Sequence, residues 1–209
     1  MMFNTPNGLW VNSLREEVIA KMVEAGLVYA NLAIEHGDDH IRNNVIGKML
    51  ERDKIFEANR LLKKYKVKTV GMFLMGFPED TDETLQNSYN MMEELELDNY
   101  SVQTVIPFPE TKLFNQVVKE KILLGNWNMD EMWRTPITLG QYGQKQGFLI
   151  KPHNMSIDSL EKWRSKFDEI KLKYWTIASK KTKYANLEKL SANKIPKKNS
   201  GLIFESLEP

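Results

Sequence analysis

Apolar positions along the chain follow two alternating patterns. Three short apolar runs, at about 27–35, 67–75 and 100–106, have the length of buried strands. The segments between them repeat apolar residues three or four positions apart, which is typical of amphipathic helices. The runs recur about every 35 residues and are near-continuous, as in strands covered on both faces. The pattern predicts an α/β fold with a parallel sheet, either a barrel or an open doubly wound sheet.

Helix-start signals divide the segments between the predicted strands. Ser13 and Glu16 have capping-box spacing, Asp53 is an N-cap candidate, and Asp80 or Thr81 caps a helix that runs to about 94. Before Asp53, a helical spacing of apolar residues begins near 41 and reaches 49. A further helix begins at the sequence "TKLFNQVVKE".

The last third of the chain breaks this rhythm. Residues 125–155 are rich in Gly, Asn and Gln and read as a lid or a linker. A long helix follows from Ser156 to about Lys180, with an aromatic stripe that includes Trp163, Phe167 and Tyr174 and would pack on the domain or on a partner. The lysine-rich residues 180–200 read as a solvated tail. We expect three parts, 1–124, 125–155 and a mainly helical extension at 156–209.

The ends of the three predicted strands carry the candidate chemistry. Ligands of parallel α/β folds bind at the carboxyl ends of the strands. Glu35 ends the first run, Gly76 the second, and Ile106 with Pro107 the third. A carboxylate, a backbone without a side chain and an apolar shelf would suit a nucleoside-like ligand with one flat face.

Composition excludes several functional classes. Net charge is +1, which gives no general reason to expect nucleic acid or an anionic membrane as partner. No apolar stretch approaches the roughly 20 residues of a membrane span, and the first residues do not resemble a signal peptide, so a cytoplasmic location is expected. The sequence has no cysteine. Disulfides, zinc–cysteine sites, thiol nucleophiles and iron–sulfur clusters bound by the chain's own thiolates are therefore excluded.

Four segments together resemble a known enzyme family. They are "PNGL" at 6–9, "IEHG" at 34–37, "GFPEDT" at 76–81 and "PFPETKL" at 107–113. Their order and spacing are similar to the second half of the radical S-adenosylmethionine (SAM) core, and most like the branch that often carries an upstream cobalamin-binding domain. In that branch the corresponding segments read PNGL, as a turn after the third barrel strand, then IESG, GFPGET and PxPGTxL. Two departures are His36 in place of serine and Glu79-Asp80 in place of Gly-Glu.

The resemblance implies a fold and an activity. The fold would be a partial TIM-type (β/α) barrel that contains strands three to six, with Met1 inside the third strand. The first two strands would carry the CxxxCxxC loop of a [4Fe-4S] cluster, and the resemblance implies that the intact enzyme generates a 5′-deoxyadenosyl radical. This chain would then be an inactive C-terminal piece, from a truncated reading frame, which is the preferred origin, or from a split or degenerate domain. Cobalamin use would depend on residues outside it, and the small-molecule substrate is not indicated.

The same resemblance assigns SAM-binding positions but no catalytic residue and no metal ligand. Glu35 would accept hydrogen bonds from the ribose hydroxyls or the amino group of SAM, and Arg42 would pair with the methionine carboxylate. Four residues would border the adenine: Leu74, Gly76, Ile106 and Pro107.

Two alternatives come from other functional classes. The chain could be a non-catalytic domain that binds SAM or another nucleotide, or that supports a partner subunit supplying the remaining strands; an exposed barrel edge would favour such partnering. It could also be a metal-dependent barrel hydrolase. His36 and His40 lie four positions apart beside Asp38 and Asp39, with His153 as a further histidine. The remaining ligands expected of such a hydrolase are not visible in order along the predicted strands.

Overall fold

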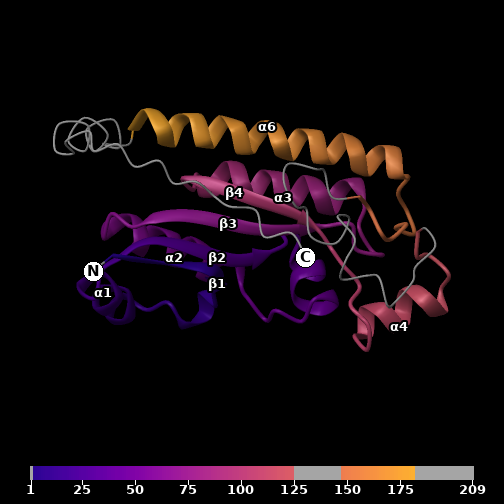
Figure 1. Ribbon diagram of the computed structural model, residues 1–209, viewed down its shortest axis with the longest axis horizontal. Helices are drawn as coiled ribbons and strands as arrows, with labels where there is room; N and C mark the ends of the chain where they lie inside the picture. Colours follow the sequence, from indigo (N-terminus) through magenta and orange to yellow (C-terminus); the bar gives the residue numbers. More distant parts are fainter. Residues whose placement is uncertain (1, 125–146, 182–209) are drawn as a thin grey trace, which may run out of the picture.

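A four-stranded parallel sheet organises the described part of the molecule (Figure 1). The computed structural model describes residues 2–124 and 147–181. Within them, β1 (Phe3–Leu9), β2 (Leu27–Glu35), β3 (Lys68–Met75) and β4 (Asn99–Thr104) pair in the order β1-β2-β3-β4, and every pairing is parallel. The three predicted strands are confirmed within one or two residues.

Helices connect the successive strands. This strand–helix alternation makes the fold α/β and of the partial TIM type. The helical elements are η1 (Val11–Ser13), α1 (Glu16–Glu24), the π-helix η2 (Ile41–Val45), α2 (Arg52–Lys64), α3 (Asp82–Leu95), α4 (Lys112–Lys119) and α6 (Ile157–Lys181). In the described ranges, none of them is long and apolar enough to cross a membrane.

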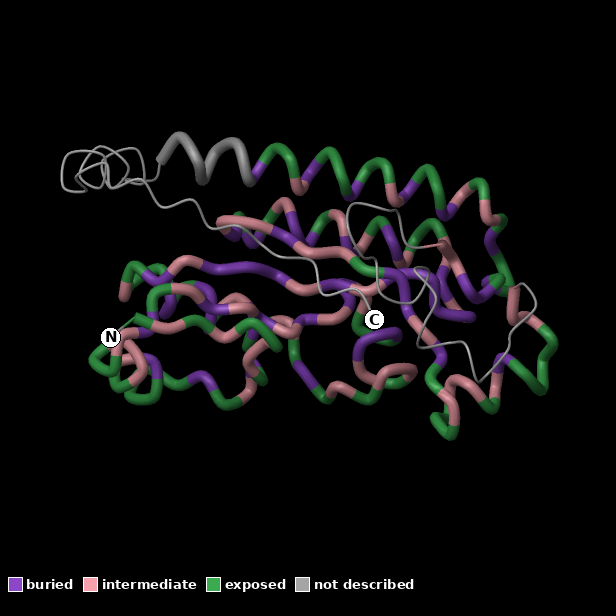
Figure 2. The backbone as a smooth tube through the Cα atoms, in the orientation of Figure 1, coloured by how far each residue is buried: buried purple, intermediate pink, exposed green. Residues whose placement is uncertain are grey.

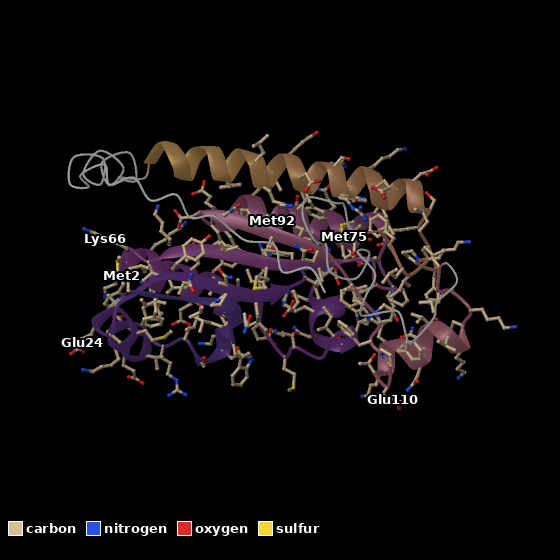
Figure 3. All side chains as sticks on the ribbon, in the orientation of Figure 1. Met2, Glu24, Lys66, Met75, Met92 and Glu110 are labelled. Carbon is tan, nitrogen blue, oxygen red and sulfur yellow. The ribbon has the colours of Figure 1, made fainter. Side chains whose placement is uncertain are left out.

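The carboxyl ends of β2, β3 and β4 meet at one edge of the sheet. Glu35 pairs with Phe73, and Met75 pairs with Thr104. The N–H of Val105 continues the ladder by donating to the carbonyl of Met75 at 2.9 Å. Figure 3 shows Met75 far from Met2 and Lys66, which lie at the opposite end of the sheet. The loops that follow these three strands therefore share one rim.

The main core lies between the sheet and its helices (Figure 2). On β2, burial alternates: Ala30, Leu32 and Ile34 are buried, whereas Asn31 and Ala33 on the other face are partly exposed. The sequence predicted cover on both faces. In the described ranges the helices cover one face closely, and the second face of β2 stays accessible, as the inward face of an open barrel would.

The aromatic stripe of α6 packs within the chain. Trp163, Phe167 and Tyr174 are buried against α3 and β4, beside which α6 lies in Figure 1. Trp163 Nε1 donates to Asp82 Oδ1 at 2.7 Å, and the Tyr174 hydroxyl donates to the carbonyl of Glu93 at 3.1 Å. Of the two alternatives for this stripe, packing on the domain is confirmed.

Several helix boundaries differ from the prediction. Helix α1 begins at Glu16 after Arg15, and the Ser13 hydroxyl donates to the carbonyl of Trp10, so the predicted capping box is wrong. Glu51, not Asp53, precedes α2. Thr81 is the N-cap of α3 and forms a capping box with Thr84, as one of the two alternatives had it.

Two further segments depart from helix and turn expectations. Met49 is exposed and has a positive φ of 49°, because the helical stretch before α2 is only the short π-helix η2. The sequence "PNGL" lies inside β1 rather than in a turn after it. The pairing of β1 with β2 shifts register between Thr5 and Leu9, and Gly8 has a φ of +85°. The strand is therefore bulged where a turn was expected.

The predicted linker and tail fall largely outside the described residues. Residues 125–146 and 182–209 belong to that part, including most of the predicted lid and the lysine-rich tail. Where the description resumes, an isolated antiparallel bridge joins Ile150 to Leu123. Gly147 and Phe148, just before this bridge, lie near the carboxyl ends of β3 and β4.

Candidate functional site at the sheet rim

Glu35 is the last residue of β2 and carries the carboxylate of the rim. Its φ is +71°, a left-handed conformation that is uncommon for a residue other than glycine. The Nζ of Lys48 donates to Glu35 Oε1 at 2.7 Å, and both side chains are 20% exposed. A carboxylate has about four acceptor positions. The partly exposed group therefore keeps acceptor capacity for the hydroxyl groups of a ligand.

Arg42 lies below the rim and is fully buried. Its Nε donates to the carbonyl of Leu50 at 2.7 Å, and its Nη1 donates to the carbonyl of His36 at 2.9 Å. Nη2 donates to the carboxylate of Asp39. In this conformation all three guanidinium nitrogens bind groups of the chain itself, which favours a structural role. Pairing of Arg42 with a ligand carboxylate stays a prediction.

The loop after β3 is held by one buried carboxylate. Asp80 Oδ2 accepts the N–H of Gly76 at 2.7 Å and the N–H of Phe77 at 2.9 Å. Gly76 has a φ of +93°, which a residue with a side chain rarely adopts. The glycine and Asp80 therefore act together to turn the chain sharply away from the strand.

Phe148 lies in front of Gly76. A Cβ placed on Gly76 would be 3.4 Å from Phe148 Cδ1, and the guanidinium carbon of Arg164 lies 4.0 Å from the centre of the Phe148 ring. The ring of Phe148 thus occupies the space that a side chain at position 76 would enter. Close approach of a ligand to Gly76 from that side stays a prediction, and it would require Phe148 to move.

Apolar residues form the floor of the rim. Leu74 packs partly buried in a small cluster with Ile41, Phe77 and Val105. Pro107 is buried and Ile106 is partly exposed, directly after β4. The parallel register brings Glu35, Leu74, Gly76, Ile106 and Pro107 to the same edge. Arg42 is the one predicted residue whose polar groups are turned inward.

His36 is the functional candidate whose surroundings the sequence did not indicate. It is fully buried, and its Nδ1 accepts the N–H of Asp38 at 3.0 Å. Its Nε2 lies 3.2 Å from Asp80 Oδ1 but forms no hydrogen bond there, and it has no other hydrogen-bond partner in the described part of the chain. In the sequence, His36 and His40 lie four positions apart, which suggested a shared metal site and gave no sign of the contact between His36 and Asp80.

The histidines do not gather around a metal position. His40 is exposed whereas His36 is buried, and His153 Nε2 lies 3.2 Å from the carboxylate of Glu120, the C-cap residue of α4. Across residues 2–124 and 147–181, no group of three or more His, Cys, Asp or Glu side chains could hold a metal ion. The arrangement gives the metal-dependent hydrolase no support.

Asp38 carries a perturbed charge next to His36. Burial acts to raise the pKa of Asp38, but hydrogen bonds from the Ile41 N–H and from Asn87 outweigh it, and the pKa lies below its ordinary value. Asn87 Nδ2 donates to Asp38 Oδ2 at 2.9 Å. The loop after β2 is therefore anchored to α3 through an ionised carboxylate.

The site suits a nucleoside better than it suits an iron–sulfur cluster. A partly exposed carboxylate beside an apolar floor can accept ribose hydroxyls while a flat base lies on the apolar side chains. An iron–sulfur cluster requires thiolates, and the 209 residues include no cysteine. The residues present therefore fit the adenosyl part of SAM and do not fit the cluster.

Comparison with known proteins finds a matching family model and two curated relatives. Residues 3–92 match a family model described as the radical SAM superfamily. An uncharacterized methyltransferase of Pyrococcus horikoshii is 28% identical over 118 residues, which is 56% of this chain and 26% of that protein. A protein of Methanocaldococcus jannaschii, provisionally named a methylthiotransferase, is 28% identical over 117 residues, or 54% of this chain and 26% of that protein.

A solved structure shows the same fold. The coproporphyrinogen III oxidase of Escherichia coli, described as a radical SAM enzyme, superposes with a TM-score of 0.50 at 13% identity, covering 77% of this chain and 31% of that one. The chain spans about a quarter of the length of the curated relatives it matches, 26% in each case.

Proposed function

We propose that this chain, whose residues 3–92 belong to the radical SAM superfamily, binds SAM at the rim formed by the carboxyl ends of β2, β3 and β4. We further propose that it is the part of a radical SAM enzyme that orients SAM. The relatives' names extend this proposal to transfer of a methyl or methylthio group, without fixing the substrate.

One observation carries the proposal. Neighbouring parallel strands bring a partly exposed carboxylate, Glu35, to the same edge as the apolar side chains of Leu74 and Ile106. Binding sites in parallel α/β folds form at this edge. The positive φ of Glu35 adds weight, since residues held in sparsely populated conformations concentrate at functional sites.

The side chains of the rim have distinct tasks in this proposal. Glu35 accepts hydrogen bonds from the ribose hydroxyls, and Lys48 holds the carboxylate in place. Leu74 and Ile106 exclude water from one face of the adenine. When bound and reduced, SAM supplies a 5′-deoxyadenosyl radical that takes a hydrogen atom from substrate. The thiolates of a [4Fe-4S] cluster would have to come from another segment or a partner subunit, and cobalamin would likewise be bound elsewhere.

Calorimetric titration of the purified chain with SAM tests the binding step. We expect one site with a dissociation constant below about 1 mM. Glu35→Gln, which keeps the shape but removes the charge, should weaken SAM binding by about tenfold, because hydrogen bonds to a charged acceptor contribute about 1.5–3 kcal/mol. The control is Glu24→Gln at the opposite end of the sheet, where Glu24 pairs with Lys21 on the surface. It should bind SAM as the unmodified chain does.

Two outcomes would overturn the proposal. One is the absence of saturable SAM binding by the folded chain; the other is equal binding by the Glu35→Gln and Glu24→Gln proteins. A non-catalytic nucleotide-binding domain is the second candidate, favoured by the lack of cysteine. It predicts that ATP or adenosine competes with SAM at equal affinity, whereas a SAM site should also require the methionine part.

A further inference from the structure

We infer that His36 is a positioning residue that ties the loop after β2 to the loop after β3, and so fixes Glu35 relative to Gly76. This inference rests on the proposed function, because it concerns how the SAM-binding rim is held. It adds a residue that the resemblance does not provide, since the similar family has serine at this position.

His36 lies between the two loops. Its imidazole is fully buried and stands edge-on to Phe77, with 6.3 Å between the ring centres. Nδ1 faces its own loop at Asp38, and Nε2 faces Asp80 of the other loop at 3.2 Å. One side chain therefore contacts both segments that leave the rim.

The contacts of Nδ1 assign the tautomer. Nδ1 accepts the backbone N–H of Asp38, so Nδ1 carries no proton of its own. The Ser88 hydroxyl lies 3.3 Å from the same nitrogen and accepts the N–H of Gly37 at 2.9 Å, so its own proton is free to point to Nδ1. The proton of a neutral imidazole then resides on Nε2, which faces the carboxylate of Asp80.

Asp80 transmits this contact to the backbone of the second loop. It is fully buried, and its carboxylate, which lies against His36, accepts the N–H groups of Gly76 and Phe77 and the hydroxyl of Thr84. A buried carboxylate that water does not reach needs such hydrogen-bond donors. A change in His36 should therefore appear first at the two amides that Asp80 holds.

The loop after β2 packs closely against α3. A Cβ on Gly37 would lie 2.3 Å from the Cα of Ser88 and 2.6 Å from the carbonyl oxygen of Asn87, so the two backbones are almost in contact. Because α3 begins directly after the second loop, both loops and the first turns of α3 form one unit with His36 at its centre.

The order Ser88, His36, Asp80 resembles a hydrolase triad but does not act as one. All three side chains are at most 1% exposed, so no substrate reaches the Ser88 hydroxyl. That hydroxyl also accepts the backbone N–H of Gly37, which fixes its position between the first loop and α3. The geometry points to positioning.

Paired substitutions separate the two sides of the ring. His36→Asn places an amide oxygen near the position of Nδ1 and removes the contact with Asp80; His36→Gln can place an amide N–H near the position of Nε2. The matched control is Asn59→Ala, which removes a buried bond from Asn59 Nδ2 to the carbonyl of Leu95 at the other end of α3. Urea unfolding would establish how far each substitution destabilises the protein.

Hydrogen exchange followed by NMR gives a readout that does not depend on SAM. We expect the amides of Gly76 and Phe77 to exchange about tenfold faster in His36→Asn than in Asn59→Ala, with partial recovery in His36→Gln. SAM should bind about tenfold more weakly to His36→Asn and normally to Asn59→Ala. Nitrogen chemical shifts of the unmodified protein should show a proton on Nε2.

The outcomes distinguish this inference from the proposed function. Equal exchange at Gly76 and Phe77 in His36→Asn and Asn59→Ala, or a proton on Nδ1, overturns the tie. Faster exchange with unchanged SAM affinity shows a structural tie and overturns the positioning role, while SAM binding itself stands. If the unmodified chain binds no SAM, the proposed function fails and so does the positioning role; the exchange data then establish or refute only the tie.

Discussion

At the scale of single residues, the rim carries the carboxylate of Glu35, whose backbone has a positive φ, beside the ammonium group of Lys48. Lys48→Gln should lower the free energy of unfolding by about 1 kcal/mol, since its partner Glu35 is largely shielded from water and would keep an uncompensated charge. Chemical denaturation measures this. The control is Lys54→Gln, which breaks an exposed pair with Glu57 and should change stability by less than about 0.5 kcal/mol. Equal losses would mean that the rim pair is no more sheltered than a surface pair.

Tyr100 is a residue whose ionisation couples to stability. Its buried hydroxyl donates to the carbonyl of Met92 and accepts the N–H of Leu97, and burial raises its pKa well above the ordinary value of 10.0. The folded state therefore keeps a proton that the unfolded state loses above about pH 10. Stability should be unaffected by this group below pH 10 and should fall as pH rises beyond it.

Replacement of Tyr100 by Phe tests this coupling. Tyr100→Phe should cost about 1–3 kcal/mol at neutral pH, because the buried N–H of Leu97 loses its acceptor. It should also make the loss of stability above pH 10 less steep, as followed by denaturant unfolding at several pH values. An unchanged slope would show that another group titrates there.

At the scale of elements, α6 is joined to the first turn of α3. Asp82 Oδ1 accepts from Trp163 Nε1 and from the Ser159 hydroxyl at 2.9 Å. Asp82→Ala should lower the free energy of unfolding by about 1–2 kcal/mol, since the buried indole loses its acceptor. Glu83→Ala is the matched control, because Glu83 occupies the same helical turn and has the same interaction with the helix dipole. Trp163 fluorescence during urea unfolding would report both.

The same contact has a pH signature. Hydrogen bonds from Trp163, and then from Ser159, lower the pKa of Asp82. A carboxyl group with a lowered pKa in the folded state stabilises the protein above its unfolded value, near 4, and this stabilisation is lost as pH falls below that value. When the Asp82→Ala protein is titrated with acid, its free energy of unfolding should decline less below about pH 4 than that of the unmodified protein. A decline identical to that of the unmodified protein would contradict the assignment.

The sequence predicted elements better than it predicted their junctions. The apolar runs placed β2, β3 and β4, since such runs reflect burial along a whole segment. The capping box at Ser13 failed, because a short 3-10 turn uses that hydroxyl locally. The apolar pattern did not indicate β1, because Pro6 and Gly8 interrupt it, and the resemblance alone implied a strand at the start of the chain. The pairing of β1 depends on β2, which lies 18 or more residues away along the chain.

The site was predictable in position and unpredictable in its inner contacts. Strand ends of a parallel sheet must share an edge, so Glu35, Gly76 and Pro107 could be grouped in advance. Nothing local to His36 reveals that Asp80, 44 positions later, lies against its ring. The two departures from the similar family, at His36 and at Glu79-Asp80, are thus in contact through His36 and Asp80, and only the tertiary structure shows it.

At the scale of the whole molecule, the absence of cysteine separates binding from radical chemistry. Anaerobic incubation of the chain with iron and sulfide should give no iron–sulfur absorption band, because no thiolate is available. The same preparation should still bind SAM. A band that survives gel filtration would show that other side chains hold a cluster and would contradict this expectation.

The outer edge of β1 is a second whole-molecule feature. β1 ends the sheet in the described part of the chain, and beside it Phe3, Val18, Met22 and Ala25 line a shallow apolar depression. An unprotected edge next to apolar surface favours association. Sedimentation velocity should therefore show self-association that rises with concentration. Val18→Lys should reduce it, whereas Val118→Lys, at another exposed valine, on α4, should not.

The near-contact of Gly37 with α3 also has an evolutionary consequence. In a saturation library selected for folding, position 37 should accept glycine alone, since even a methyl group would push the helix away from the sheet. Position 36 should tolerate several polar residues under that selection and become restricted only when ligand affinity is selected as well. Selection for folding would thus restrict position 37, and selection for ligand affinity would restrict its neighbour, position 36.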